Sequence, residues 1–284
     1  MILVTGATGI TGSEVVRQLA ATGVPVRAFV RDAGKAARLP GVEIAVGDLD
    51  RPETLVRALD GVDRLFLLTP VDPRQVEQQG HAVDAAQRAG VHHVVKLSVL
   101  GAGLDASQSI ARWHGQTEKQ IEKSGMAWTH LRPHYFMQNT LGFAPSIAAR
   151  GALHAPMRDG RIGLVDTRDI AAVAACVLTQ SGHEGKVYEI TGPEALSFHD
   201  IAARIGEVTG RAITYVDVSP SDAEKWFVAG GMPAWLADAL VGFFGIFAAG
   251  HASTTTRVIE DVTGTPARTF AQFVADHAHV FAAV

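Results

Sequence analysis

The chain has 284 residues, of which 47% are hydrophobic and 19% are charged, and its formal net charge is −4. This composition excludes a disordered protein, the acidic balance gives no reason to expect nucleic-acid binding, and no apolar run is long enough to cross a membrane. The length allows one large domain or two closely packed lobes, and the single cysteine, Cys176, excludes an internal disulfide and fits a cytoplasmic protein.

The first twelve residues carry the strongest local pattern. Residues 1–4 are all apolar, as in a buried parallel strand, and three glycines spaced by three residues follow, just before an amphipathic helix. Strand, glycine turn and helix in this order predict a dinucleotide-binding turn with the spacing GxxGxxG. The helix amino terminus would offer N–H groups to a pyrophosphate. We expect the cofactor to contact Gly6, Thr8, Gly9, Ile10, Thr11 and Gly12.

The end of the second predicted strand, residues 25–30, indicates which nicotinamide cofactor binds. In dinucleotide-binding folds the residue at this strand end contacts the adenosine ribose. Arg31 stands there, and a guanidinium can pair with a 2′-phosphate, so NADP(H) is favoured. Asp32 could bind a ribose hydroxyl instead, which keeps NAD(H) as the alternative. Lys35 and Arg38 could share the phosphate contact.

Further apolar stretches continue the alternation of strands and helices. Strands are predicted at residues 42–46, 65–68, 93–97 and 126–131, which favours an α/β fold with a Rossmann-like, doubly wound parallel sheet. Nucleotides bind at the carboxyl edge of such sheets. We therefore expect Asp48 and Leu49 near the adenine, and further cofactor contacts from the next strand ends at Leu68, Thr69, Pro70 and Ser98.

The alternation weakens after residue 140. Residues 1–139 are predicted to form the NAD(P)-binding portion, and residues 140–284 a smaller α/β lobe that binds substrate and packs with it as one unit. In this lobe we predict helices and strands at residues 171–178, 186–190, 198–208 and 213–218, and two aromatic-rich helical segments around 226–227 and 235–247.

Five stretches in combination resemble a known family. They are GATGITG at residues 6–12, FVRD at 29–32, GDLD at 47–50, HGQTEK at 114–119 and LRPHYFMQN at 131–139. The chain is similar to the NmrA-like branch of the atypical short-chain dehydrogenases/reductases, near its NAD(P)H:quinone oxidoreductase and triphenylmethane reductase members. The resemblance implies a cofactor spread over the glycine turn and the strand ends, and a substrate cleft between the sheet edge and the C-terminal lobe.

The helix predicted at residues 108–124 departs from the wider dehydrogenase pattern. Ordinary members carry Tyr-x-x-x-Lys, in which the lysine lowers the pKa of a tyrosine that exchanges a proton with the carbonyl oxygen. This chain has His114 and Glu118 at that spacing, as in quinone-reductase-like members. His114 is the candidate catalytic residue, with a solvated helix histidine as the alternative. Glu118 is expected to orient the imidazole or to face water.

Residues that follow the strand at 126–131 are expected to face the cleft. Pro133 and Tyr135 are predicted to contact the nicotinamide. The predicted substrate contacts are Trp113, Phe136, Asn139, Phe243 and Phe244. For Phe136 and for the helical segment that carries the last two, packing in the core is the alternative.

These patterns together predict an NADPH-dependent oxidoreductase that transfers hydride to a quinone or a similar flat conjugated aromatic acceptor. A quinone needs little acid catalysis, so the enzyme has mainly to stack the acceptor and exclude water. Two alternatives stay open: a tailoring oxidoreductase or oxygenase acting on a polycyclic aromatic polyketide-type substrate, and a non-catalytic NADP(H)-sensing regulatory protein. No metal-ligand pattern stands out, and a homodimer is compatible with the sequence.

Overall fold

A computed structural model describes residues 1–36 and 41–282. The chain forms two compact units. The first contains Met1–Pro133, Thr167–Glu189 and Asp261–Gly264, and the second contains His134–Asp166, Ile190–Glu260 and Thr265–Val284.

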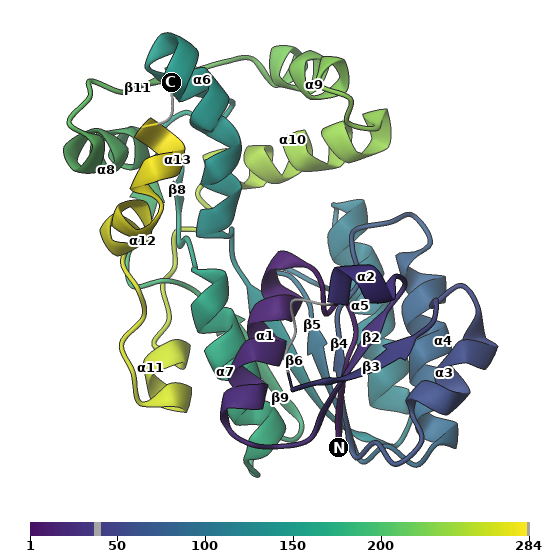
Figure 1. Ribbon diagram of the computed structural model, residues 1–284. Helices are drawn as coiled ribbons and strands as arrows, with labels where there is room; N and C mark the ends of the chain where they lie inside the picture. Colours follow the sequence, from purple (N-terminus) through teal and green to yellow (C-terminus); the bar gives the residue numbers. More distant parts are fainter. Residues whose placement is uncertain (37–40, 283–284) are drawn as a thin grey trace. The chain divides into compact units, whose positions relative to one another are not determined.

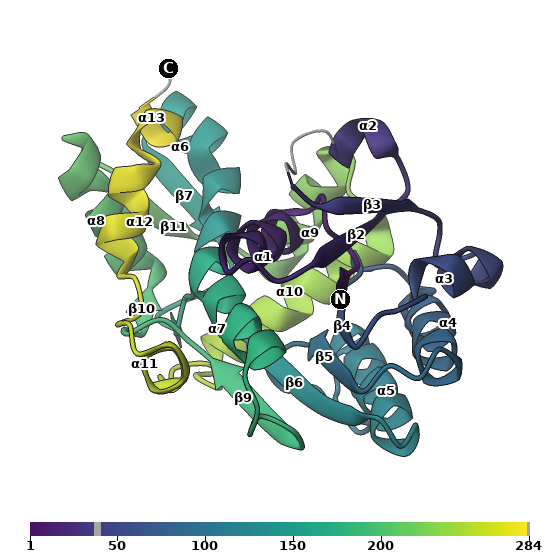
Figure 2. The same cartoon turned by 60° about the horizontal axis from the view of Figure 1, so that its bottom comes forward.

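The first unit is built on a seven-stranded sheet of order β3-β2-β1-β4-β5-β6-β9 (Figures 1 and 2). Its strands are β1 (Ile2–Val4), β2 (Val26–Val30), β3 (Glu43–Val46), β4 (Arg64–Leu67), β5 (His93–Leu97), β6 (Ala127–Pro133) and β9 (Lys186–Ile190). All pairings from β3 to β6 are parallel. The order 3-2-1-4-5-6 is that of the Rossmann fold, so the predicted fold class is confirmed.

Helices cover both faces of this sheet. Two of them, α1 (Ile10–Ala21) and α7 (Thr167–Thr179), pack against each other on one face. The opposite layer contains α3 (Pro52–Ala58), α4 (Gln75–Arg88) and α5 (Ser109–Lys123), while the short α2 (Ala33–Ala36) follows β2. The central strands are apolar because both faces are covered: Leu3, Leu65 and Val94 have no exposed surface.

The second unit combines short strands with an aromatic-rich set of helices. It contains η1 (Met137–Phe143), α6 (Ala144–Arg150), β7 (Ala152–Ala155), β8 (Arg161–Ile162), β10 (Leu196–Ser197), α8 (Phe198–Thr209), β11 (Thr214–Asp217), α9 (Pro220–Ala229), α10 (Ala234–Ala248), α12 (Phe270–Asp276) and α13 (Ala278–Ala282). β7 pairs in parallel with β11, and β8 pairs antiparallel with β10. The two aromatic segments are helical as predicted. A further helix, α11 (Val258–Thr263), has residues in both units.

Two classes of feature are absent from the described part of the chain. None of its helices combines the length and the apolar character that crossing a bilayer requires. Within the same residues, no three side chains of His, Cys, Asp or Glu are grouped so that they could hold a metal ion.

Candidate functional site

The carboxyl ends of the parallel strands bring the predicted cofactor-binding residues to one edge of the first unit. The glycine turn follows β1, Arg31 follows β2, and Asp48 comes two residues after β3. Thr69 and Ser98 follow β4 and β5 at the same edge. The structure therefore brings together residues that are up to about ninety positions apart in the sequence, as parallel pairing requires.

The glycine turn is packed so closely that side chains are excluded from it. Gly6 has φ +62°, and a Cβ atom there would lie 2.9 Å from Leu68. A Cβ atom on Gly12 would lie 2.1 Å from the Gly6 carbonyl oxygen, so α1 packs directly on the turn. The Thr5 hydroxyl donates to the Leu68 carbonyl oxygen at 2.8 Å and joins the ends of β1 and β4. This cradle leaves the backbone open to a ligand.

The amino terminus of α1 is suited to an anion. Its N-cap is Gly9, no side chain caps it, and its first turn contains no acidic residue. Ile10, at the first helical position, exposes 68% of its surface. Backbone N–H groups and the positive end of the helix dipole therefore have no competing carboxylate. Together with the glycine cradle, these features fit a pyrophosphate.

The residues predicted to read the adenosine differ in how they are engaged. Arg31 is exposed and makes no hydrogen bond or ion pair with the described residues. Asp32 Oδ1 accepts from the Gly34 backbone N–H at 2.8 Å, and Asp48 Oδ1 accepts from the Asp50 N–H at 3.1 Å. The Arg31 guanidinium is thus available for a phosphate. Arg38 lies outside the described residues.

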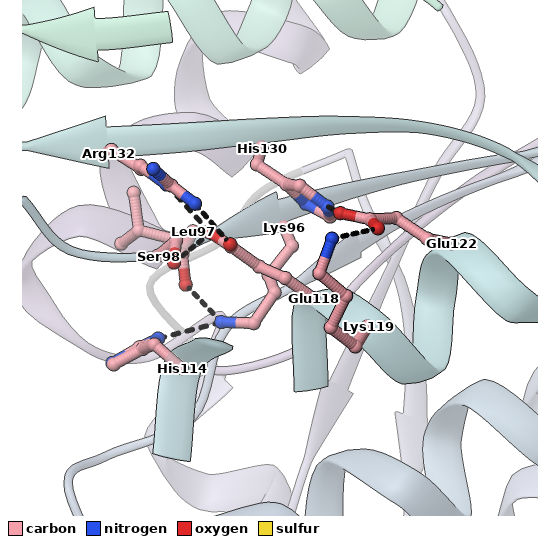
Figure 3. A network of polar contacts seen from close by, with 9 residues as sticks. All are labelled: Lys96, Leu97, Ser98, His114, Glu118, Lys119, Glu122, His130 and Arg132. Atoms are coloured by element: carbon pink, nitrogen blue, oxygen red, sulfur yellow. Dashed lines mark hydrogen bonds and ion pairs between the residues drawn. The ribbon is translucent and has the colours of Figure 1, made fainter. Parts of the chain in front are cut away.

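A second group of polar side chains lies where α5 packs beside β5 and β6 (Figure 3). Lys96, on β5, has no exposed surface. Its Nζ lies 2.7 Å from His114 Nδ1 and donates to the Leu97 carbonyl oxygen at 3.1 Å. Burial lowers the pKa of Lys96 to about 7, with the Glu118 charge opposing the shift and the Arg132 charge adding to it.

His114 is buried, with 9% of its surface exposed, so the alternative of a solvated helix histidine is wrong. Burial, and then the Lys96 charge, hold the pKa of its imidazole well below the usual range. The ring is therefore neutral, and an ammonium that donates to Nδ1 places the ring proton on Nε2. Nε2 has no hydrogen-bond partner among the described residues, so its proton is available to a bound acceptor.

Glu118 neither orients the His114 imidazole nor faces water, the two possibilities that its spacing to His114 suggested. With 2% of its surface exposed, it accepts hydrogen bonds from Ser98 Oγ at 2.6 Å and from Arg132 Nε at 3.0 Å and Nη2 at 2.5 Å. Burial raises the pKa of its carboxyl group, but the bonds from Arg132 and Ser98 outweigh it and lower the pKa overall. Glu118 is therefore a carboxylate paired with Arg132 and Ser98, and it makes no hydrogen bond with His114.

The predicted substrate residues of the second unit include part of an aromatic cluster. The Tyr135 ring centroid lies 6.2 Å from that of buried Phe244 and 6.1 Å from that of Phe247. Phe243 is half-buried beside Phe247, at 6.1 Å. The Tyr135 hydroxyl makes no hydrogen bond with the described residues, and burial raises the pKa of Tyr135. This packing is compatible with the core alternative, and the predicted substrate contacts stay predictions.

The other predicted residues outside the glycine turn are placed as follows. In the first unit, Trp113 is half-buried on α5, and Pro133 ends β6 and accepts from the Leu100 N–H at 3.1 Å. Thr69 is buried and accepts from Gln79 Nε2 at 2.7 Å. In the second unit, Asn139 is exposed, and the half-buried Phe136 pairs through a parallel bridge with Val165.

Two residues of the network, Lys96 and Arg132, were not expected from the sequence. One signal for Lys96 was available in the sequence. It interrupts the otherwise apolar run from Val94 to Leu97, and charged residues are rarely buried unless they are paired. Arg132 is the residue before the end of β6, where an arginine is common, so its partner could be found only from the packing of α5 on β6.

Comparison with known proteins agrees with this architecture. Residues 1–272 match the NmrA-like family. An NAD(P)H azoreductase of Xenophilus azovorans is 43% identical over 100% of both chains. The NADPH-dependent quinone oxidoreductase of Escherichia coli, complexed with NADPH, superimposes with a TM-score of 0.90 at 32% identity and covers 98% of this chain and 100% of its own. For triphenylmethane reductase of Citrobacter sp., complexed with NADP(H), the TM-score is 0.88 at 28% identity, over 98% and 100%. Because the family match extends over nearly all of its length, the chain belongs to the NmrA-like family.

Proposed function

We propose that the protein is an NADPH-dependent oxidoreductase of the quinone-reductase or azoreductase type, and that its acceptors are quinones or similar flat conjugated molecules. The observation that carries this proposal is the buried His114, whose Nδ1 lies 2.7 Å from Lys96 Nζ, in a unit whose glycine turn fits a dinucleotide. NADP(H) is the preferred cofactor, with NAD(H) as a weaker one.

The names of the relatives support the class of reaction. An azoreductase, a quinone oxidoreductase and a triphenylmethane reductase are each named for reduction, and azo compounds, quinones and triphenylmethane dyes are conjugated electron acceptors. Neither the tailoring alternative nor the regulatory alternative gains support from these relatives. These relatives therefore favour the predicted reduction of a conjugated acceptor.

Different residues of the first unit are proposed to bind different parts of the cofactor. The glycine turn and the amino terminus of α1 would hold the pyrophosphate, and Arg31 would pair with the 2′-phosphate. Asp48 and Leu49 are proposed to lie against the adenine. When bound, NADPH supplies a hydride with its electron pair to the acceptor.

His114 is proposed to act on the oxygen of the acceptor. Its Nε2–H can donate a hydrogen bond to a carbonyl oxygen and then a proton. A hydroquinone anion spreads its charge over the ring, so the acid need not be strong. Aromatic side chains would stack the acceptor, and we keep the predicted contacts of Trp113, Phe136, Asn139, Phe243 and Phe244, and the nicotinamide contacts of Pro133 and Tyr135, as proposals.

The test is turnover by the purified protein with a panel of benzo-, naphtho- and anthraquinones and an azo dye. We expect NADPH oxidation with formation of hydroquinone, faster with NADPH than with NADH. His114→Ala is expected to lower kcat by about 100-fold, the usual contribution of a general acid. Lys119→Ala is the matched control, since Lys119 is an exposed residue of the same helix paired with Glu122. No turnover with any acceptor would overturn the proposal.

A further inference from the structure

Lys96 is a buried cation that has no role in the reaction proposed above. Resting on that proposed function, we propose that Lys96 and His114 form a proton relay: His114 gives its Nε2 proton to the oxygen of the acceptor while Lys96 gives a proton to His114 Nδ1. Lys96 is then the internal proton source of the reduction, and a carbonyl acceptor is the substrate class that such a relay serves.

The surroundings of Lys96 explain why a proton could leave it. Its two hydrogen-bond partners, His114 Nδ1 and the Leu97 carbonyl oxygen, are both neutral acceptors (Figure 3). Within the described residues Lys96 makes no ion pair, because the nearby Glu118 is bound by Arg132 and Ser98 instead. A buried ammonium without a counter-ion is costly, and losing a proton removes the cost.

The contact with Leu97 fixes the direction of one hydrogen bond of Lys96, and the charge of the ammonium, which has no lone pair, fixes that of the other. A carbonyl oxygen can only accept, so Nζ donates to it, and the remaining protons of the ammonium point elsewhere, one of them to His114 Nδ1. A relay through both ring nitrogens never leaves the imidazole with two protons or with none. That matters because burial disfavours the imidazolium, and an imidazolate is far too basic to form.

Protons and electrons balance in this relay. The hydride brings both electrons to the acceptor, and the acceptor oxygen takes the Nε2 proton of His114. The Nδ1 atom takes a proton from Lys96, which is left as a neutral amine. After the product leaves, water protonates Nε2 and the Nδ1 proton returns to Lys96. One proton is consumed for each acceptor reduced.

Burial of Lys96 sets the pH range of the relay, and the charges that face it adjust that range. His114 and Glu118 face it from α5 and Arg132 acts on it from β6, where His130 also senses its charge. Burial lowers the pKa of Lys96 to about 7, so the amine can lose and regain a proton near neutral pH. Since the protonated form is the donor, turnover should fall as pH rises above this value.

Two acceptors that differ in their need for a proton provide the test. Hydride reduction of a quinone requires a proton, whereas a triarylmethyl cation dye becomes neutral by taking up the hydride alone. We expect Lys96→Met to lower kcat for a quinone by about 100-fold and to change the rate for the dye by at most about threefold. Lys96→Gln keeps a neutral donor for Nδ1 but has no proton to give up, so it should lose as much.

Several results would overturn the relay. They are an equal loss with both acceptors at unchanged NADPH affinity, and recovery of quinone reduction in Lys96→Gln, which would make Lys96 a positioning residue. A third test needs no variant: with the wild-type protein, kcat for the quinone should fall about tenfold per pH unit above about pH 7 and show a solvent isotope effect, whereas the dye should show neither. Parallel profiles for the two acceptors would contradict the relay.

A measurement on the cofactor-free protein separates this inference from the proposed function. Nitrogen NMR of the histidine rings should show His114 with Nε2 protonated and Nδ1 unprotonated, and Lys96→Met should remove this preference. A protein that reduces no quinone would overturn the proposed function, yet this spectrum would still report on the bond between Lys96 and His114. A ring protonated at Nδ1 in the wild-type protein would overturn the relay.

Discussion

Two cations of the buried network, Arg132 and Lys96, lie on the neighbouring strands β6 and β5, and they differ in the charge of their hydrogen-bond partners. Arg132 meets a carboxylate: two of its nitrogens bond to Glu118, at 3.0 and 2.5 Å. Lys96 meets a carbonyl oxygen and an imidazole, which carry no charge. A counter-charge holds a proton in place, whereas neutral partners leave it free to move. We therefore expect Arg132 to stabilise the fold, and we propose the chemical role for Lys96.

The largest expected effect comes from removing the compensated cation. Arg132→Leu leaves the Glu118 carboxylate buried with the Ser98 hydroxyl as its remaining side-chain donor, and we expect it to lower the free energy of unfolding by about 3–5 kcal/mol. Urea denaturation measures the change. The matched control is Lys119→Leu, which removes an exposed ion pair and should cost less than about 1 kcal/mol.

A double variant tests whether the unpaired Glu118 carboxylate causes the loss of stability in Arg132→Leu. Arg132→Leu combined with Glu118→Leu removes both charges, and it should recover much of the stability lost in the single variant. If the double variant is no more stable than Arg132→Leu, the loss comes from packing and not from the uncompensated carboxylate.

An intermediate effect is expected from Lys96→Met, and it depends on pH. The folded protein holds the pKa of Lys96 at about 7, below the ordinary value of about 10.4 for the unfolded chain. Between these values the unfolded state binds more protons, so the wild-type protein should gain stability as pH rises, by up to about 1.4 kcal/mol per pH unit. The penalty of the buried charge is fully present below pH 7.

The comparison of the two proteins isolates this contribution. Lys96→Met cannot titrate, so its stability relative to the wild-type protein should decrease by about 2 kcal/mol between about pH 7 and about pH 9. Other groups titrate in both proteins and cancel in the difference. A constant difference across this range, from urea denaturation at each pH, would show that Lys96 keeps an ordinary pKa.

The fold was predictable from local pattern, but the network was not. Residues 1–21 contain β1, the turn and α1 in consecutive positions, so the strand, the glycine spacing and the helix could be predicted directly. The side-chain bonds of the network that join α5 to Lys96, Ser98 and Arg132 connect positions 14 to 20 residues apart, and they form only because α5 packs beside β5 and β6. Helical spacing alone left Glu118 either to orient His114 or to face water, since it could not show the donors Ser98 and Arg132.

The smallest expected effect concerns a third cation, Arg31, which has neither a carboxylate nor burial. It is exposed at the end of β2 and bonds to none of the described residues, so its removal should leave the free energy of unfolding within about 0.5 kcal/mol of the wild-type value. If it pairs with the 2′-phosphate, Arg31→Ala should weaken NADPH binding by about tenfold, the loss of a charge-assisted bond at a solvated site.

Binding of the two cofactors to the same variant identifies the phosphate as the partner. Because NADH lacks the 2′-phosphate, Arg31→Ala should leave its affinity unchanged when both are measured by quenching of tryptophan fluorescence. Lys35→Ala, at the next exposed cation along the chain, should cost less than Arg31→Ala, since it stands four residues further from the strand end. Equal losses of affinity for NADPH and NADH would mean that Arg31 contacts a part of the cofactor that both molecules share.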